Sequence, residues 1–228
     1  MRIAFMFALA LAAASAVADD APAIEDNSFL IEEAYNQDPR TVQHIFTYTR
    51  LRDGSWAASF TQEWPLGGQK HQGSYSLVTD RRSLAGAEIN YRYQLYGGDN
   101  THVAIAPRLS YVLPVNGSKA GIDAMLPVSV IVNPRFYTHY NLGVTHTDDT
   151  RTTAGFSAIY VVQPKLHAML EMLAQREHET TITISPGVRW AYDFKSGLQI
   201  VPGIALPVTV RPSHERAVLL YLSFEHPY

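Results

Sequence analysis

Apolar and polar residues alternate along most of the chain with a period of two. In residues 84–96 (LAGAEINYRYQLY), alternate positions carry Ala, Ile, Tyr and Leu, and most of the positions between them carry Gly, Glu, Asn, Arg and Gln. A helix would scatter these two sets around its axis, whereas a strand places each set on one face. The same split recurs in residues 102–113, 135–145 and 181–194. The pattern therefore predicts strands with one apolar and one polar face.

Twelve such strands are predicted, and most of them are long. They cover residues 41–51, 55–64, 71–79, 84–96, 101–113, 120–132, 134–146, 153–163, 165–175, 180–194, 197–210 and 216–228. Most reach the roughly 9 to 11 residues that a tilted strand needs to cross a bilayer, whereas strands in globular proteins average about 5 to 6. We therefore predict an all-β fold, a transmembrane antiparallel up-and-down β-barrel of about 12 strands, or about ten if strands merge in the Gly- and Ser-rich residues 66–84.

The connections between these strands differ on the two sides of the predicted barrel. On the side where the first strand begins and the last one ends, they are tight and marked by Gly or Pro, as in PLGGQ, GGDN, NP, QP and KSG. On the other side they are mostly longer and more charged, as in VNGSKAG, THTDDTRTT and QREHET. Short periplasmic turns and longer extracellular loops are typical of outer-membrane barrels.

Residues 1–18 have the pattern of a secretory signal peptide. A basic residue precedes an apolar run, and Ala16-Val17-Ala18 supplies the small residues of a cleavage site. Beyond it, no run approaches the roughly 18 to 20 apolar residues of a membrane helix. We therefore divide the chain into a signal peptide (1–18), a periplasmic N-terminal segment (19–40) and an outer-membrane β-barrel (41–228).

Composition narrows the classes of function. The 18 Lys and Arg against 21 Asp and Glu give a net charge of -3, which disfavours nucleic-acid binding. The absence of Cys excludes disulfides, thiolate metal sites and a Cys nucleophile. His146, His178 and His214 match no metal-binding spacing, and His139 is followed two residues later by Asn141 rather than by the Ser found in barrel lipid hydrolases. We expect no metal, no cofactor and no catalytic residue, and therefore no enzyme.

The last predicted strand ends the chain on an aromatic residue. RAVLLYLSFEHPY (216–228) places Val218, Leu220, Leu222, Phe224 and Tyr228 on one parity. This resembles the C-terminal insertion signal of bacterial outer-membrane barrels, and it implies the barrel-assembly machinery as a partner. The chain would then reside in the cell outer membrane, in contact with outer-membrane lipid and lipopolysaccharide.

Three segments carry a resemblance to a known family. SFLIEEAYNQDPRTVQHI (28–45), FTQEWPLGGQKHQGSYSL (60–77) and YLSFEHPY (221–228) resemble segments of bacterial outer-membrane proteins of the phenol-degradation meta-pathway transporter family. The likeness covers both ends of the mature chain, and the middle only through its strand pattern. It implies a barrel that moves small, often hydrophobic molecules, and it specifies no substrate.

The polar parity of the strands predicts which side chains face the lumen. These are Glu63, Glu88, Arg92, Arg108, His139, His167, Glu171, Arg189, Asp193 and Glu225. A barrel of about 12 strands is wider than one of about eight strands, whose interior is filled by side chains, and narrower than a porin of about 16. One reading is that these charges pair to satisfy a buried interior. The other is that Glu88, Arg92, Arg108, His139, Glu171, Arg189 and Asp193 also line a solute path and select by charge.

The N-terminal segment has two readings as well. Phe29, Leu30, Glu32, Glu33 and Tyr35 form no clean apolar stripe, although one or two helical turns capped by Asn27 or Ser28 would fit, and an irregular course is the alternative. The segment is either a plug that docks into the periplasmic mouth or a flexible leader.

The leading hypothesis is an outer-membrane barrel forming a narrow channel or transporter for small-molecule solutes, which the family resemblance suggests are hydrophobic or aromatic. One alternative is a non-transporting barrel with a structural or adhesive role through its loops. Another is a soluble periplasmic β-barrel with an apolar ligand pocket. The sequence alone leaves all three open.

Overall fold

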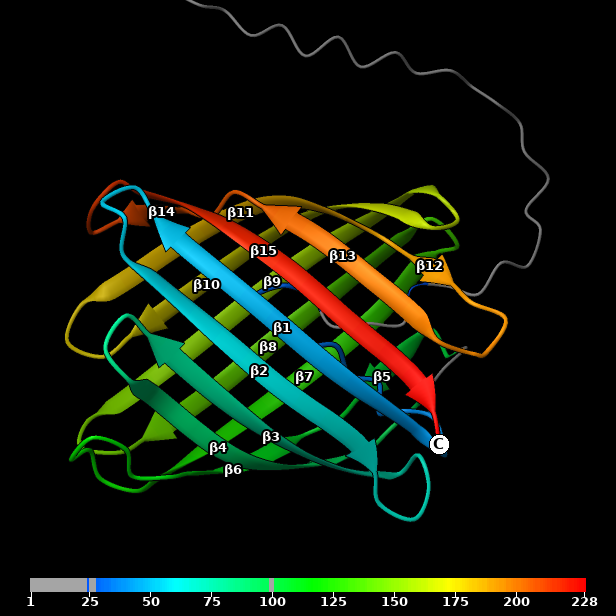
Figure 1. The fold of residues 1–228 in the computed structure, drawn as a ribbon, viewed down its shortest axis with the longest axis horizontal. Coiled ribbons are helices and arrows are strands. Elements are labelled where there is room, and N and C mark those ends of the chain that lie inside the picture. Colours follow the sequence, from blue (N-terminus) through cyan, green and yellow to red (C-terminus); the bar gives the residue numbers. More distant parts are fainter. Residues whose placement is uncertain (1–23, 25–27, 99–100) are drawn as a thin grey trace, which may run out of the picture.

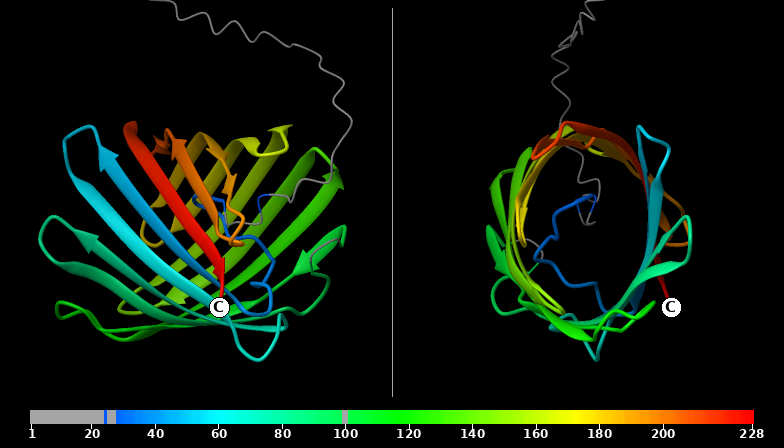
Figure 2. Two further views of the ribbon diagram at one scale, coloured as in Figure 1. Left: turned by 45° about the vertical axis from the view of Figure 1, so that its right-hand side comes forward. Right: turned by 90° about the vertical axis from the view of Figure 1, so that its left-hand side faces the viewer.

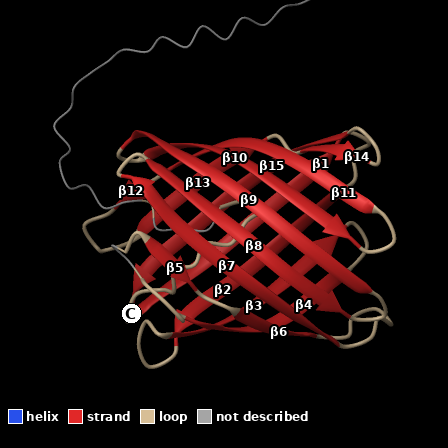
Figure 3. Cartoon of the chain, turned by 180° about the vertical axis from the view of Figure 1, so that it is seen from behind, coloured by secondary structure: helices blue, strands red, loops and turns tan. Residues whose placement is uncertain are grey.

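The computed structural model describes residues 24, 28–98 and 101–228 of the chain, and all of its regular elements are strands (Figure 3). Among these residues, none forms a helix long and apolar enough to cross a membrane. The predicted signal peptide, residues 1–18, lies outside the described residues, as does most of the stretch from 19 to 27.

Fifteen strand segments follow one another along the chain (Figure 1). They are β1 (Thr41–Leu51), β2 (Trp56–Pro65), β3 (His71–Asp80), β4 (Leu84–Tyr93), β5 (Val103–Ile105), β6 (Arg108–Val112), β7 (Gly121–Asn133), β8 (Phe136–His146), β9 (Thr150–Gln163), β10 (Leu166–Arg176), β11 (Thr180–Trp190), β12 (Tyr192–Asp193), β13 (Gln199–Ala205), β14 (Val208–Arg211) and β15 (Glu215–Pro227).

These segments make a barrel of twelve strands, because three pairs of them are halves of one strand. β5 and β6 form one strand, because both pair with β7 in a single register. β11 and β12 form a second, because both pair with β13. β13 and β14 form the third, because both pair with β11 on one side and β15 on the other. Prolines lie at two of the three interruptions, Pro107 and Pro207, where the missing N–H removes a ladder hydrogen bond. The prediction of an antiparallel barrel of about 12 strands is confirmed, and the ten-strand alternative is wrong.

The barrel closes between its first and last strands. β1 pairs with β15 along its whole length, from Thr41 opposite Pro227 to Leu51 opposite Ala217. Both ends of the barrel therefore lie at the rim where β1 begins, as Figure 1 shows for the C-terminus. Closure leaves no unpaired sheet edge, which a barrel needs in a medium without water.

Alternate side chains point to opposite sides of the wall, as the sequence predicts. In β4, Ile89 and Tyr91 are exposed outward, whereas Asn90 and Arg92 are buried inside. Outward apolar residues recur around the barrel, and those of β8 and β10 include Leu142 (63% exposed) and Leu170 (50% exposed). A soluble protein rarely exposes so continuous an apolar surface.

The prediction of longer loops at one rim is wrong. The stretches expected to be loops around residues 147–152 and 175–179 are tight hairpins, with turns at 147–149 and 177–179. The reason is that ladder pairing continues past the predicted strand ends, with Thr145 opposite Arg151 and His146 opposite Thr150. On this rim only the connection at residues 113–120 is long.

The N-terminal residues 28–40 lie inside the barrel. The right-hand view of Figure 2 shows this segment, in blue, within the ring of strands. It contains bends and turns and no helix, so the predicted helical turns are wrong there and the irregular alternative holds. Most of its residues from Ser28 to Gln37 are buried.

Candidate functional site in the lumen

The backbone of the N-terminal segment is held by side chains of the barrel wall. The amide N–H groups of Leu30, Glu32, Ala34 and Asn36 donate to acceptors on the wall or its adjoining turn, at donor–acceptor distances between 2.8 and 3.1 Å. The acceptors are Glu171 Oε1, Asn141 Oδ1, Ser129 Oγ and Gln94 Oε1, in that order. Because the donors are every second residue, this face of an extended chain follows the wall from β10 to the end of β4.

This arrangement explains why the segment is not helical. In a helix, each amide would donate to the carbonyl four residues earlier, and the wall acceptors would be left without these donors. A buried polar group without a partner costs about 1 to 3 kcal/mol. Asn141 also donates from Nδ2 to the carbonyl of Glu32 at 2.9 Å, so one amide side chain pairs both backbone groups of that residue.

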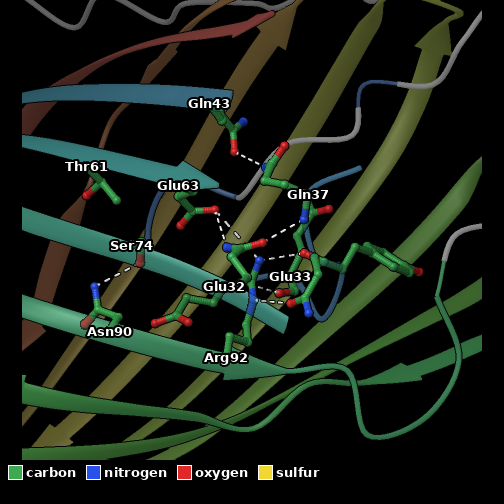
Figure 4. Close-up of polar contacts among 12 residues, drawn as sticks. Glu32, Glu33, Gln37, Gln43, Thr61, Glu63, Ser74, Asn90 and Arg92 are labelled. Carbon is green, nitrogen blue, oxygen red and sulfur yellow. Dashed lines mark hydrogen bonds and ion pairs between the residues drawn. The ribbon is translucent and has the colours of Figure 1, made fainter. Parts of the chain in front are cut away.

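Arg92 binds the second half of the segment. Its guanidinium donates to Asn36 Oδ1 at 2.9 Å and to the carbonyls of Glu33 and Tyr35 at 3.2 and 2.6 Å. Glu63 lies 3.8 Å away on the wall and forms an ion pair with it (Figure 4). Arg92 is 3% exposed, so its charge is neutralised within the barrel rather than by water.

Arg108 joins a cluster of carboxylates where the segment meets β6 and β7. It forms ion pairs with Glu32 at 2.8 Å, Asp123 at 2.9 Å and Glu88 at 3.8 Å. Its Nη1 also donates to Asn90 Oδ1 at 3.2 Å, and it contacts Ser110 Oγ. One guanidinium therefore connects the segment, through Glu32, to three wall strands.

Arg189 holds the middle of the segment through Glu33. The guanidinium of Arg189 and the carboxylate of Glu33 lie 3.2 Å apart, and His139 Nε2 lies 3.6 Å from the same oxygen of Glu33. Burial raises the pKa of Glu33 to about 7, although Arg189 and Arg92 oppose that rise. Glu33 is thus a carboxyl group that changes its charge near neutral pH while it is docked.

The beginning of the segment packs on an apolar part of the lumen. The ring of Phe29 lies 5.0 Å from that of Tyr221, centroid to centroid. A Cβ built on Gly203 would come within 2.5 Å of the Phe29 ring, and one on Gly187 within 2.7 Å. Both glycines are therefore required for the close approach of this ring. The buried apolar cluster around it comprises Ile24, Ile45, Ile159, Met169, Ala191, Val201, Ala205, Leu219 and Tyr221.

His139 makes a contact that the sequence did not reveal. Its Nδ1 lies 2.7 Å from Ser129 Oγ, a residue directly opposite on β7, and its Nε2 faces Glu33. A hydroxyl, an imidazole and a carboxylate in a row resemble a hydrolase triad. However, Ser129 and His139 are 0% and 2% exposed, and Ser129 Oγ already accepts the amide of Ala34. In this conformation the contact serves to dock the segment.

The structure brings most of the predicted lumen residues together, but not all. Asp193 lies at the rim, where it is bound by Gln199 at 2.8 Å and by Lys165, away from the network around the segment. Glu225 lies in register with Gln199 near the same rim. His167 is buried opposite Arg189, next to the network. Among the described residues, no group of three or more His, Asp or Glu is placed to hold a metal ion.

Sequence reasoning missed the amide and hydroxyl side chains of the site. Gln37 donates from Nε2 to Gln43 Oε1 at 2.5 Å (Figure 4), and its backbone N–H donates to Gln72 Oε1 at 2.7 Å. Ser157 bonds Ser28 at 3.0 Å. The strand alternation places these wall residues on the lumen face. Their amide and hydroxyl groups can bind backbone N–H and C=O groups, so these two features together could have identified them.

Comparison with known proteins gives the fold. Neither a protein-family model nor a curated protein matches the sequence. Among solved structures, the KdgM porin superposes with a TM-score of 0.63 at 11% identity, covering 82% of this chain and 99% of that one, and it has also been solved in complex with disordered oligogalacturonate. The NanC porin superposes with a TM-score of 0.57 at 12% identity, covering 80% and 98%. The β domain of the Bordetella autotransporter BrkA gives 0.52 at 9% identity, covering 84% and 100%.

The fold and the outer surface together place the chain in the outer membrane. Closed β-barrels are one of only two backbone arrangements that can span a bilayer, and this one carries apolar side chains around its outside. The predicted location is confirmed, and the soluble periplasmic alternative is wrong because a water-facing barrel would not expose Leu142 and its neighbours.

Proposed function

We propose that the protein is an outer-membrane channel for small solutes, apolar or aromatic in character, and that residues 28–37 act as its plug. The Phe29 ring carries this proposal, since it occupies an apolar position in the lumen between Gly187, Gly203 and Tyr221. Once the segment moves away, a solute with a benzene-sized ring can occupy the same position, against Gly187 and Gly203 and beside the ring of Tyr221. The resemblance to the phenol-degradation meta-pathway transporter family supports the same solute class.

The pairing of charges in the lumen favours the passage of neutral solutes over acidic ones. Arg92 pairs with Glu63 and Arg108 pairs with Asp123 and Glu88, all on the wall, so these pairs do not depend on the segment. An acidic sugar polymer, such as the one in the KdgM complex, would have to compete for guanidinium groups that are already paired. An aromatic solute would instead displace one phenyl ring.

The experiment compares solutes of similar size that differ in aromatic character. Liposome swelling is measured with phenylalanine and with glutamine for the wild type, for Phe29→Ala and for the double variant Phe29→Ala, Gly203→Val. We expect Phe29→Ala to raise phenylalanine flux about tenfold relative to glutamine flux, since one buried ring contributes about 1.5 to 3 kcal/mol. The added valine should remove this advantage by filling the position. Phe46→Ala, on the outer face, is the control and should change neither flux.

The possible failures are distinguishable. If no variant passes either solute, the chain is not a channel, and the non-transporting alternative, structural or adhesive, is supported. If both solutes pass equally in every variant, the protein is a channel but the Phe29 position does not select aromatic rings.

A further inference from the structure

Three arginines face outward at the rim opposite the one where Thr41 pairs with Pro227. Arg50 lies opposite Val218 in the β1–β15 ladder, and Val218 is exposed on the outer face. Arg216 lies opposite Val208, which in turn lies opposite the exposed Ile184. Directly paired residues point to the same side of a sheet, so Arg50 and Arg216 point outward.

Arg211 belongs to the same face. The β11–β14 ladder shifts its register by one residue after Thr209, so Arg211 lies opposite Ile182, which shares the outward face of β11 with Ile184. β14, β15 and β1 are consecutive in the wall, and neighbouring strands lie about 5 Å apart, so the three guanidinium groups are within reach of one multivalent ligand. We call Arg50, Arg211 and Arg216 the outer arginine patch.

The charges of this patch are not balanced by nearby carboxylates. Among the described residues, none forms an ion pair with Arg50, Arg211 or Arg216, and all three are exposed. Asp53, three residues after Arg50, accepts hydrogen bonds from the N–H and the hydroxyl of Ser55. Glu215, next to Arg216, lies opposite Thr209, whose hydroxyl bonds Thr183 on the lumen side. It therefore points inward, away from the patch.

Other sectors of the same outer rim lack such a group. The outward positions there include Leu84 in β4, Ile122 in β7 and His146 in β8. Arg176 at the end of β10 also points outward, but the residues opposite it on the two neighbouring strands, Thr152 and Thr180, carry no charge. Unopposed positive charge on the outer face is thus concentrated on β14, β15 and β1.

Directly below the patch the wall is apolar. Val218, Leu220 and Ile204 are exposed on the outer face, and Phe46 lies opposite Leu222 on the neighbouring strand. Arginines above a lipid-facing surface meet headgroups, and guanidinium pairs with phosphate in a two-point geometry. A ligand that suits both parts has acyl chains and more than one phosphate.

The orientation of the barrel determines which leaflet of the outer membrane the outer arginine patch faces. An exported chain reaches the outer membrane from the periplasm, and both ends of this barrel lie at the rim where Thr41 pairs with Pro227. That rim remains periplasmic when the hairpins cross, which puts the arginines in the outer leaflet. We propose that the outer arginine patch is a binding site for the phosphate groups of lipid A, the membrane anchor of lipopolysaccharide.

The test measures lipid A bound to the full-length protein in detergent by native mass spectrometry. Bis-phosphorylated lipid A is titrated into delipidated wild type, into R50Q/R211Q/R216Q and into R81Q/R82Q/K119Q. The second triple variant removes the same charge from turns at the same rim and leaves every strand residue unchanged. A basic residue at a lipid surface contributes about a factor of five, so we expect the patch variant to lose affinity about a hundredfold and the control about twofold or less. Heat-modifiable migration on gels checks that each variant is folded.

Ligands without the second phosphate sharpen the result. Monophosphorylated lipid A should bind the wild type more weakly than the bis-phosphorylated form, and phosphatidylglycerol more weakly still. The proposal is overturned if both triple variants lose affinity equally, because bulk charge would then explain binding. It is also overturned if the patch variant retains wild-type affinity, or if phosphatidylglycerol binds as well as lipid A.

Discussion

A buried carboxyl group of the N-terminal segment, Glu33, contributes to making its docking sensitive to pH. The groups that face it are Arg189 of β11, Arg92 of β4, and His139 and Tyr137 of β8. Its pKa when docked is about 7, above the ordinary value of 4.5, and burial is the main cause. The docked state therefore binds the proton more tightly than the undocked state does. Docking is strongest below the ordinary pKa and weakens as the pH rises through about 7.

We therefore expect the channel to open more often at about pH 8 than at about pH 5, with the docking equilibrium changing by about ten- to a hundredfold. Single-channel open probability in planar bilayers measures this. Glu33→Gln should remove most of the pH dependence and keep the docked state favoured, because the amide needs no proton. Glu215→Gln, an exposed change at the opposite rim, serves as the control. A pH dependence that persists unchanged in Glu33→Gln would assign it to another group.

At the scale of elements, the segment and the wall are joined mainly by polar contacts. Five backbone N–H groups, three arginines and one phenyl ring hold residues 28–37 in the lumen. Within the part of the chain that the structure describes, some buried wall groups have no hydrogen-bond partner, among them His167 Nδ1 and Ser185 Oγ. Water would satisfy these groups once the segment leaves, which lowers the cost of undocking.

Deleting residues 28–37 should therefore leave a folded barrel and raise its conductance. If the docked state holds about 90% of the molecules or more, the mean conductance rises about tenfold. A synthetic peptide of residues 24–40, added at the rim where Thr41 pairs with Pro227, should restore the low conductance. Shortening the connection at residues 113–120 on the other rim is the control. Equal conductance of the deletion variant and the wild type would show that the segment does not obstruct the path.

The sequence predicts the wall far better than the segment. The strands follow from alternation, because residues such as Ile89 and Asn90 must face lipid and lumen in turn, and the observed bounds lie close to the predicted ones. The course of residues 28–37 has no such period. It depends on Gln94, Ser129, Asn141 and Glu171, which come from distant strands and recognise backbone groups common to every sequence. The sequence also failed to predict that the hairpins at residues 147–149 and 177–179 are tight. Strand pairing that extends beyond the bilayer requires no alternation of apolar and polar residues, so the pattern did not reveal these strand ends.

At the scale of the whole molecule, the lipid-facing belt and the polar lumen are the two faces of one wall. Leu142 lies near the middle of β8 on the outer face, and His146 ends the same strand on the same face. A charge near the centre of a bilayer is costly, whereas a charge at the interface reaches water. The position of a substitution along one strand therefore reports how deep that residue lies in the membrane.

Leu142→Arg should lower the free energy of unfolding by about 2 to 4 kcal/mol in phospholipid vesicles, and His146→Arg by about 1 kcal/mol or less. Urea unfolding followed by tryptophan fluorescence measures both, with Leu142→Ala separating the loss of apolar area from the cost of the charge. Thr145→Arg, on the lumen face beside Asp123, tests whether a charge added inside is tolerated differently. Equal and small effects at Leu142 and His146 would mean that this face of β8 does not meet hydrocarbon, and the barrel would then have to be placed differently in the membrane.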